Sequence, residues 1–273
     1  MRDNSNHFSL DEDIERRSVP ALKVHPKVLG SDADNLFAAR APTWVLTVSI
    51  CLAILMCSNW AEGAQTPLRV MPLGDSITQG ESSSYRQPLW LALDEAGISV
   101  DFIGSMSGGY SGSHNANDYD TDHEGHWGWR ADQVLRRINQ WAKQATPDIV
   151  LMHLGTNDIG AGQDIDDTVD EIDQIIDRLR EHNPQVHVLV AAIIPVAYES
   201  ATIRITQFNE GLARLVNMKH TPTSRVVLVD HFTGFDAAQD TYDGIHPNER
   251  GNHKMAERWL VAIQSLLKSR TEN

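Results

Sequence analysis

Three short polar segments contain the side-chain types that nucleophilic catalysis requires. Ser76 lies in Met-Pro-Leu-Gly-Asp-Ser-Ile-Thr, Asn157 lies in Leu-Gly-Thr-Asn-Asp, and Asp243 and His246 lie in Asp-Gly-Ile-His-Pro. A serine hydroxyl becomes an effective nucleophile when a histidine accepts its proton and a carboxylate orients that histidine. Asp243 and His246 are three residues apart, so the carboxylate can contact one ring nitrogen while the other faces a cleft. We therefore predict a catalytic triad of Ser76, His246 and Asp243.

Each segment also has a simpler structural interpretation when it is considered alone. Ser76 can occupy an ordinary turn, Asn157 can stabilise a turn, and Asp243 or His246 can cap a helix. The serine segment is not the Gly-x-Ser-x-Gly elbow of α/β-hydrolases, because Thr78 stands where that motif has glycine. Catalysis is favoured because the three segments occur together, each where a strand is expected to end.

The rest of the chain alternates apolar runs with helical patterns. Strands are expected at 68–73, 100–103, 149–154, 186–194 and 226–229, and helices at 86–96, 131–144, 164–180, 203–218 and 247–267. Strand–helix alternation with apolar, β-branched strands indicates a parallel sheet that is covered on both faces. In such sheets ligands bind beyond the carboxyl ends of the strands, where the three polar segments would meet.

These motifs resemble those of the SGNH (GDSL-like) hydrolase superfamily. Its four namesake residues correspond to Ser76, Gly104, Asn157 and His246 of this chain, and the resemblance extends from about residue 68 to the end. It implies an α/β fold, a three-layer αβα sandwich with a five-stranded parallel sheet (flavodoxin-like). It also implies an oxyanion hole formed by the N–H groups of Ser76 and Gly104 and the side chain of Asn157, and it implies no metal or other cofactor.

Within the superfamily the chain is most similar to carbohydrate esterase family three, the acetyl xylan esterase type. The shared features are the serine segment, Asp-Phe-Ile-Gly-Ser at 101–105 and His-Glu-Gly-His-Trp-Gly-Trp at 123–129. This similarity implies hydrolysis of acetyl esters on sugars, with an acylated carbohydrate such as acetylated xylan as the substrate. A lipolytic esterase or thioesterase is the alternative enzyme, and a carbohydrate-binding domain without activity is the alternative outside catalysis.

The polar loop 105–129 offers further candidate residues. Trp127 and Trp129 could stack on sugar rings or could pack against the following helix. Asp75 is a third substrate-binding candidate. Its main expected role, however, is to stabilise the turn at Ser76 through hydrogen bonds. The loop also has six potential metal ligands, whose spacing matches neither an EF-hand nor an HExxH motif, and we predict no metal site. They are His114, Asp118, Asp120, Asp122, His123 and Glu124.

Composition narrows the class of protein. The 273 residues carry a formal net charge of −14, and no Lys/Arg cluster forms a basic face, which argues against a nucleic-acid partner. Three regions are predicted: a polar leader at 1–43, a secretory signal at 44–64 whose apolar run is 44–57, and a catalytic domain at 65–273. Both cysteines, Cys51 and Cys57, lie in the signal region. We expect a secreted or periplasmic monomer, or a membrane-anchored one that faces outside the cytoplasm if the apolar run is not cleaved.

Overall fold

The computed structural model describes residues 66–112 and 119–271, with side chains as far as 269. The predicted leader and signal region, as well as His114 and Asp118, lie outside the described residues. None of the helices within the described ranges has the length and apolar character needed to cross a membrane.

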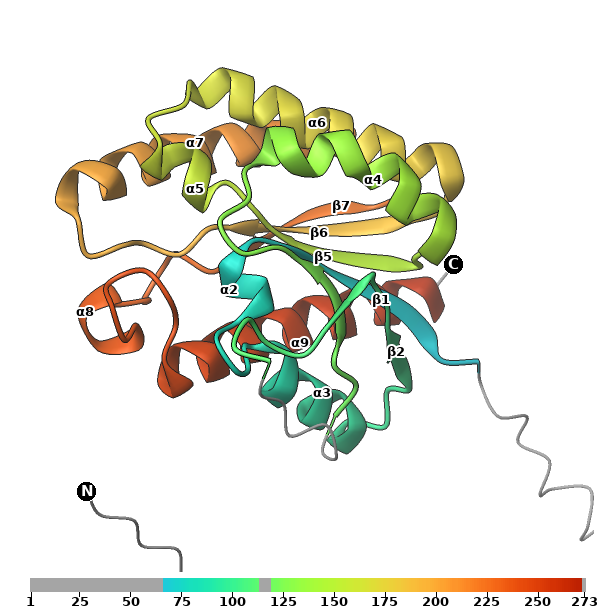
Figure 1. The fold of residues 1–273 in the computed structure, drawn as a ribbon. Coiled ribbons are helices and arrows are strands. Elements are labelled where there is room, and N and C mark those ends of the chain that lie inside the picture. The colour runs from blue at the N-terminus through green and yellow to red at the C-terminus, as the bar shows by residue number, and fades with distance from the viewer. Residues whose placement is uncertain (1–65, 113–118, 272–273) are drawn as a thin grey trace, which may run out of the picture. The chain divides into compact units, whose positions relative to one another are not determined.

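Five parallel strands form the centre of the fold, as the sequence predicts. Figure 1 shows how they are arranged. They are β1 (Leu68–Gly74), β2 (Val100–Phe102), β5 (Ile149–His153), β6 (His187–Ala192) and β7 (Val226–Asp230). Strand β1 pairs with β5, β5 with β6, and β6 with β7, all in parallel. On its other side, the first half of β1 pairs with β2 through Leu68–Val100, Arg69–Asp101 and Val70–Phe102.

The expected count of five strands is too low, because two short strands extend the sheet. Strand β4 (Asp122–Gly125) pairs in parallel with the second half of β1, and β3 (Met106–Ser107) pairs antiparallel with β4. The sheet therefore has seven strands, and the segment interpreted as loop 105–129 supplies two of them. Strand β4 was missed because Asp-His-Glu-Gly lacks the apolar, β-branched residues that mark a strand, and β3 because its two residues are too few to show a pattern.

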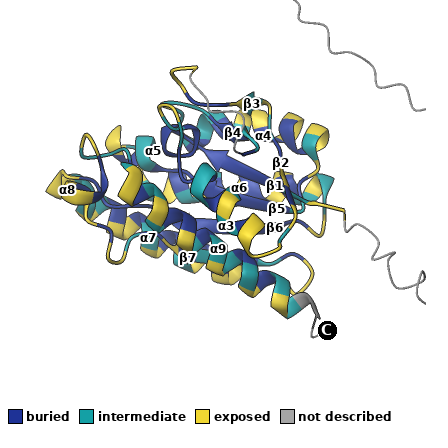
Figure 2. Cartoon of the chain, turned by 90° about the horizontal axis from the view of Figure 1, so that it is seen from below, coloured by how far each residue is buried: buried dark blue, intermediate teal, exposed yellow. Residues whose placement is uncertain are grey.

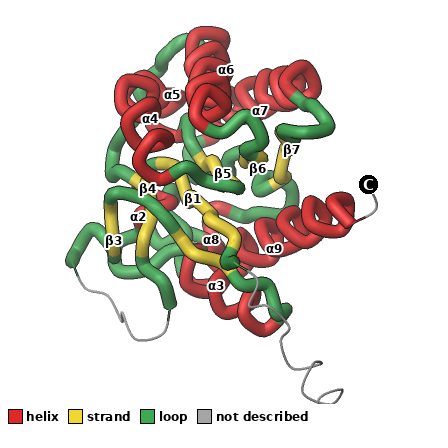
Figure 3. Tube along the Cα trace, turned by 90° about the vertical axis from the view of Figure 1, so that its right-hand side faces the viewer, coloured by secondary structure: helices red, strands yellow, loops and turns green. Residues whose placement is uncertain are grey.

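Helices cover both faces of the sheet, and alternate strand residues point to opposite layers. Helices α4 (Ala131–Ala145), α6 (Ile165–His182) and α7 (Glu199–Lys219) bury Met71 and Leu73 of β1. Helices α3 (Arg86–Glu95) and α9 (Glu249–Thr271) bury Val70 on the other face. Figure 3 shows the strands between the two helical layers, and Figure 2 shows buried strands with exposed outer helix faces.

Two fully buried histidines lie beneath the carboxyl end of the sheet. His153 ends β5, His231 follows β7, and their ring centroids are 6.2 Å apart. The His231 ring also lies 4.4 Å from the Trp259 ring, and neither of its nitrogens has a hydrogen-bond partner among the described residues. Burial lowers the pKa of His153 to about 3 and that of His231 well below its usual value of 6.5. The core therefore holds both rings in the neutral form.

We expect the His231→Phe variant to be less sensitive to acid than the wild type. The unfolded chain binds a proton at His231 below about pH 6.5, whereas the folded chain does not, so folded stability decreases as the pH falls. The free energy of unfolding of the variant, minus that of the wild type, should grow by about 1 kcal/mol per pH unit below pH 6. Urea denaturation at pH 5 and pH 8 measures this difference, and an equal difference at both values would contradict it.

Candidate active site

Ser76 lies at the strand-to-helix turn that follows β1. It is the first residue of the short helix α2 (Ser76–Gln79), and Asp75 caps that helix by accepting a hydrogen bond from Ile77 N–H at 2.9 Å. The first N–H groups of a helix have no acceptor within it, so the Ser76 N–H is available to a ligand. Ser76 is only 6% exposed, so little of its surface is accessible to solvent.

His246 links the serine to a carboxylate. Its Nε2 lies 2.9 Å from Ser76 Oγ, and its Nδ1 lies 2.7 Å from Asp243 Oδ2. With the proton on Nδ1 donated to Asp243, Nε2 is left to accept the serine proton. The three residues, predicted from two separate segments of the sequence, therefore meet in one hydrogen-bonded line, although Ser76 and His246 are 170 residues apart.

Asp243 is held in its charged form. Partial burial alone would raise its pKa, but hydrogen bonds from the His246 N–H, the imidazole and the Ile245 N–H outweigh burial and lower the pKa. Asp243 Oδ1 accepts the His246 and Ile245 N–H groups at 2.7 and 2.9 Å, which leaves Oδ2 for the imidazole. The charge is therefore available to stabilise a protonated His246.

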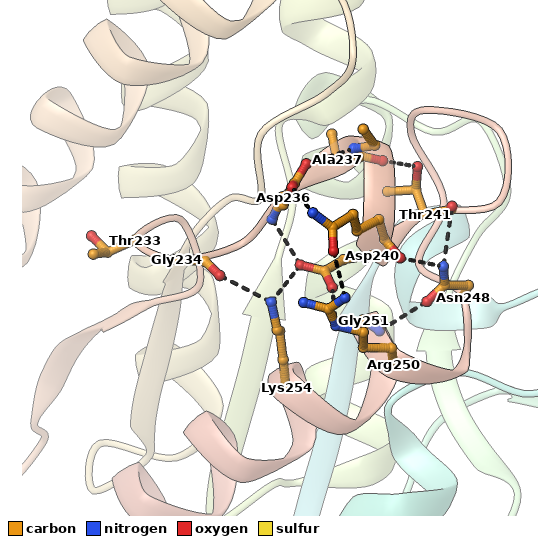
Figure 4. Close-up of polar contacts among 12 residues, drawn as sticks. Thr233, Gly234, Asp236, Ala237, Asp240, Thr241, Asn248, Arg250, Gly251 and Lys254 are labelled. Atoms are coloured by element: carbon orange, nitrogen blue, oxygen red, sulfur yellow. Dashed lines mark hydrogen bonds and ion pairs between the residues drawn. The ribbon is translucent and has the colours of Figure 1, made fainter.

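A network around the buried carboxylate of Asp240 fixes the loop that carries Asp243 and His246 (Figure 4). Asp240 ends the short helix α8 (Ala237–Asp240), and its Oδ2 lies 2.6 Å from Lys254 Nζ while its Oδ1 lies 3.0 Å from Arg250 Nε. The Asn248 N–H donates to the Asp240 carbonyl at 2.9 Å, and Thr241 forms an isolated bridge with Pro247. The two ends of the loop that carries Asp243 and His246 are thus joined.

Loss of the Asp240 carboxylate should destabilise the fold. In Asp240→Ala, the Lys254 ammonium would lose its buried partner, and we expect the free energy of unfolding to fall by about 3 kcal/mol. Chemical denaturation at neutral pH measures it. Glu257→Ala removes an exposed carboxylate from the same helix α9 and should change stability by less than about 0.5 kcal/mol. Equal stabilities of the two variants would contradict the anchoring role.

Gly104 occupies the turn after β2, where the backbone passes close to β4. A Cβ at this position would overlap the carbonyl group of His123, so only glycine fits. The buried carboxylate of Glu124 fixes the next residue, accepting from Ser105 N–H at 2.8 Å and Ser105 Oγ at 2.7 Å. The same carboxylate lies 2.7 Å from His126 Nε2. Strand β4 therefore positions the Gly104 turn beside the carboxyl end of β1.

Asn157 lies in α5 (Thr156–Gly160), directly after β5. Its Nδ2 donates to the Trp129 carbonyl at 2.9 Å. The amide has two N–H donors, so this bond orients the group and leaves the second donor for a ligand. Asp158 fixes the same helix by accepting from Ala131 N–H at 2.9 Å. These contacts orient the amide, and its role as an oxyanion donor stays a prediction.

We expect Asn157→Ala to lower kcat for an ester substrate by about 10²–10³-fold, the usual effect of losing one oxyanion donor. KM should change little, because the negative charge develops only in the transition state. Steady-state kinetics with p-nitrophenyl acetate separates the two constants. An unchanged kcat would exclude Asn157 from the oxyanion hole.

Comparison with known proteins assigns the family. The model of the GDSL-like lipase/acylhydrolase family matches residues 73–254, which include all four predicted motif residues. The chain belongs to this family. It is 30% identical over 243 residues to a multidomain esterase of Ruminococcus flavefaciens, covering 80% of this chain and 31% of that relative. The chain thus spans about a third of the length of that curated relative.

Two solved structures are similar over nearly their whole length. A carbohydrate esterase family 3 protein from Talaromyces cellulolyticus is 35% identical with a TM-score of 0.67, over 74% of this chain and 98% of that one. An acetyl esterase mutant solved with acetate ion gives the same identity, TM-score and coverage. The predicted resemblance to GDSL-like hydrolases and carbohydrate esterase family three is confirmed.

Asp75 is placed differently from the other candidate residues of this GDSL-like site. Its side chain has no exposed surface, so it braces the turn and cannot touch a substrate in this arrangement. Burial raises the pKa of Asp75 to about 7, and the nearby Asp158 carboxylate adds to the increase. The prediction that Asp75 binds substrate is therefore wrong, and Asp75 caps α2 instead.

The two candidate tryptophans have different surroundings. The Trp127 ring stacks on the His246 ring with centroids 4.7 Å apart and planes 18° apart, and the Trp127 backbone N–H donates a hydrogen bond to Gln79 Oε1 at 2.9 Å. The Trp129 ring instead packs against His126 and Trp141 at 4.4 and 5.9 Å. Trp127 thus borders His246, whereas Trp129 packs against neighbouring aromatic rings.

Sequence reasoning missed several residues that position this site. Glu124 was considered as a potential metal ligand and as part of the shared segment 123–129, but not for the role it has in the structure, which is to orient the Gly104 turn. Tyr242, whose ring is stacked 5.7 Å from that of His246, was not singled out. Arg86 is completely buried and donates to the carbonyls of Thr78, Gln79, Gly108 and Thr121. The sequence does contain a signal for this role, because Arg86 lies on the same face of its predicted helix as the apolar residues Leu89 and Leu93, which indicates a buried arginine.

Proposed function

We propose that this protein is a serine esterase that removes short acyl groups, above all acetyl, from carbohydrates such as acetylated xylan. The observation that carries the proposal is the line from Ser76 Oγ through the His246 imidazole to Asp243, with separations of 2.9 and 2.7 Å. The similarity to carbohydrate esterase family 3 and to an acetyl esterase supports the substrate class.

In the proposed reaction, Ser76 Oγ attacks the ester carbonyl and His246 Nε2 takes its proton. The Ser76 and Gly104 N–H groups and the Asn157 amide stabilise the negative oxygen that forms. The bond to the sugar oxygen then breaks, and His246 returns the proton to that oxygen, which leaves an acyl-serine and a free hydroxyl group. Water activated by His246 hydrolyses the acyl-serine to release the carboxylic acid.

The proposal is tested by acetate release from acetylated xylan, beside hydrolysis of p-nitrophenyl acetate and octanoate. We expect release of acetate from xylan and a preference for the acetyl over the octanoyl ester. A preference for octanoate would favour the lipolytic alternative, which uses the same triad. No hydrolysis of any of the three substrates would favour a carbohydrate-binding domain.

A further inference from the structure

A groove of 660 Å³ opens directly at the catalytic serine and histidine. It runs between the N-terminal parts of α3 and α9, which pack against each other. Helix α3 contributes Gln87 and Leu91, helix α9 contributes Asn252 and His253, and Tyr242 borders it beside His246. The groove is much larger than an acetyl group needs, since pockets of this size hold drug-sized ligands.

The groove lies on the leaving-group side of Ser76. Of the three predicted oxyanion donors, Gly104 and Asn157 are not among its lining residues, whereas Ser76 lies at its edge. A carbonyl oxygen held by Gly104 and Asn157 would therefore lie outside the groove. The leaving oxygen must lie within hydrogen-bonding distance of His246 Nε2, which returns its proton. The lining continues from His246 through Pro247 and Asn248 into α9, so the group attached to that oxygen enters the groove.

The lining combines unused polar groups with apolar surface. In the described part of the chain, no hydrogen bond joins the side chains of Gln87, Asn252 or His253 to another residue, so all three can bind a ligand. Leu91 and Tyr242 are 50% and 55% exposed and offer apolar surface between them. Sugars present the same mixture, because hydroxyl groups surround apolar ring faces.

Charge further restricts the occupant. Glu81 and Glu249 line the groove, while none of its described lining residues is a lysine or arginine. A uronic acid or another anionic sugar would approach like charges without a cation to pair with, which costs binding free energy. An uncharged sugar meets no such penalty.

We propose that this groove binds the alcohol portion of the ester as an uncharged sugar chain, through Gln87 and Asn252, and selects against acidic glycans. This inference rests on the proposed esterase function. It specifies in addition where the sugar binds and that the sugar is uncharged.

The test compares wild type with Gln87→Leu and Asn252→Leu on acetylated xylo-oligosaccharides and p-nitrophenyl acetate. Leucine is similar in size to both residues but cannot form hydrogen bonds. We expect each variant to lower kcat/KM for the oligosaccharide by about tenfold relative to that for p-nitrophenyl acetate, the loss of about one hydrogen bond. Val261→Ser, an exposed residue of α9 outside the groove, is the matched control and should leave the ratio unchanged.

The possible outcomes distinguish an error in the groove assignment from an error in the proposed function. Equal losses on both substrates would overturn the assignment. When p-nitrophenyl octanoate is assayed beside them, a loss confined to that ester would also overturn it, because the groove would then be an acyl site. A wild type that cleaves p-nitrophenyl acetate but no sugar ester would instead overturn the proposed substrate class, and the groove assignment with it.

A second arm tests charge with acetylated oligogalacturonides at low ionic strength. We expect the wild type to prefer the neutral oligosaccharide, and the double variant Glu81→Gln, Glu249→Gln to reduce that preference at least threefold. Charge repulsion between exposed groups is screened by salt, so the preference should also shrink as salt is added. A wild type that prefers the acidic substrate would overturn the selection against acidic glycans.

Discussion

Ser76→Ala should lower kcat for p-nitrophenyl acetate by about 10⁴-fold or more, because the variant lacks the atom that forms the acyl-enzyme. The remaining activity would come from the oxyanion donors and the binding groove, which the substitution leaves in place. Single-turnover release of p-nitrophenol measures the effect without interference from product release. This is the largest change that we expect from one substitution.

A matched serine variant controls for the Ser76 result. Ser265→Ala removes the hydroxyl group of an exposed residue of α9 and should retain wild-type kcat. Both variants should unfold at the wild-type temperature to within a few degrees, because neither hydroxyl group supports the core. If Ser76→Ala retained substantial turnover while correctly folded, another nucleophile would be required.

Asp243→Asn should lower kcat by about 10⁴-fold while leaving the loop in place. The asparagine side chain is the same size and can still accept from the His246 N–H, yet it carries no charge to stabilise the protonated imidazole. Its amide can also donate to Nδ1 and thereby move the ring proton to Nε2, the nitrogen that must accept from Ser76. Steady-state kinetics with p-nitrophenyl acetate measures the loss.

Asp94→Asn provides the comparison for Asp243. Asp94 is an exposed residue of α3 whose loss of charge should leave kcat unchanged. An Asp243→Asn variant with more than a tenth of wild-type kcat would mean that the carboxylate only orients the loop. Its two backbone hydrogen bonds would then be its main contribution.

The order and location of the catalytic segments could be predicted from the sequence for a clear reason. Apolar, β-branched strands separated by amphipathic helices form parallel sheets, and parallel strands bring their carboxyl ends to one edge. Ser76 and Asn157 follow β1 and β5, which are direct neighbours in the sheet. The proximity of Ser76 and Asn157 could therefore be predicted from the alternation of strands and helices. The 2.9 Å distance between Ser76 Oγ and His246 Nε2 is known only from the folded structure.

Residues whose effect depends on distant partners could not be assigned from the sequence. Glu124 belongs to a strand of four mostly polar residues, and its role appears only when Ser105 and His126 lie beside it. Asp240 likewise resembles an ordinary helix-end aspartate until Arg250 and Lys254 of α9 are placed next to it. Buried polar groups are satisfied by tertiary partners, which local sequence patterns do not identify.

The most direct test of the account is covalent labelling by diisopropyl fluorophosphate, followed by peptide mapping. An activated serine attacks phosphorus, fluoride leaves, and the Oγ–P bond that forms is stable. We predict one label per chain at Ser76, loss of activity in step with labelling, no label in Ser76→Ala and much slower labelling in Asp243→Asn. Complete inactivation with the label on a different residue, or full labelling of Ser76 without loss of activity, would contradict the proposed mechanism.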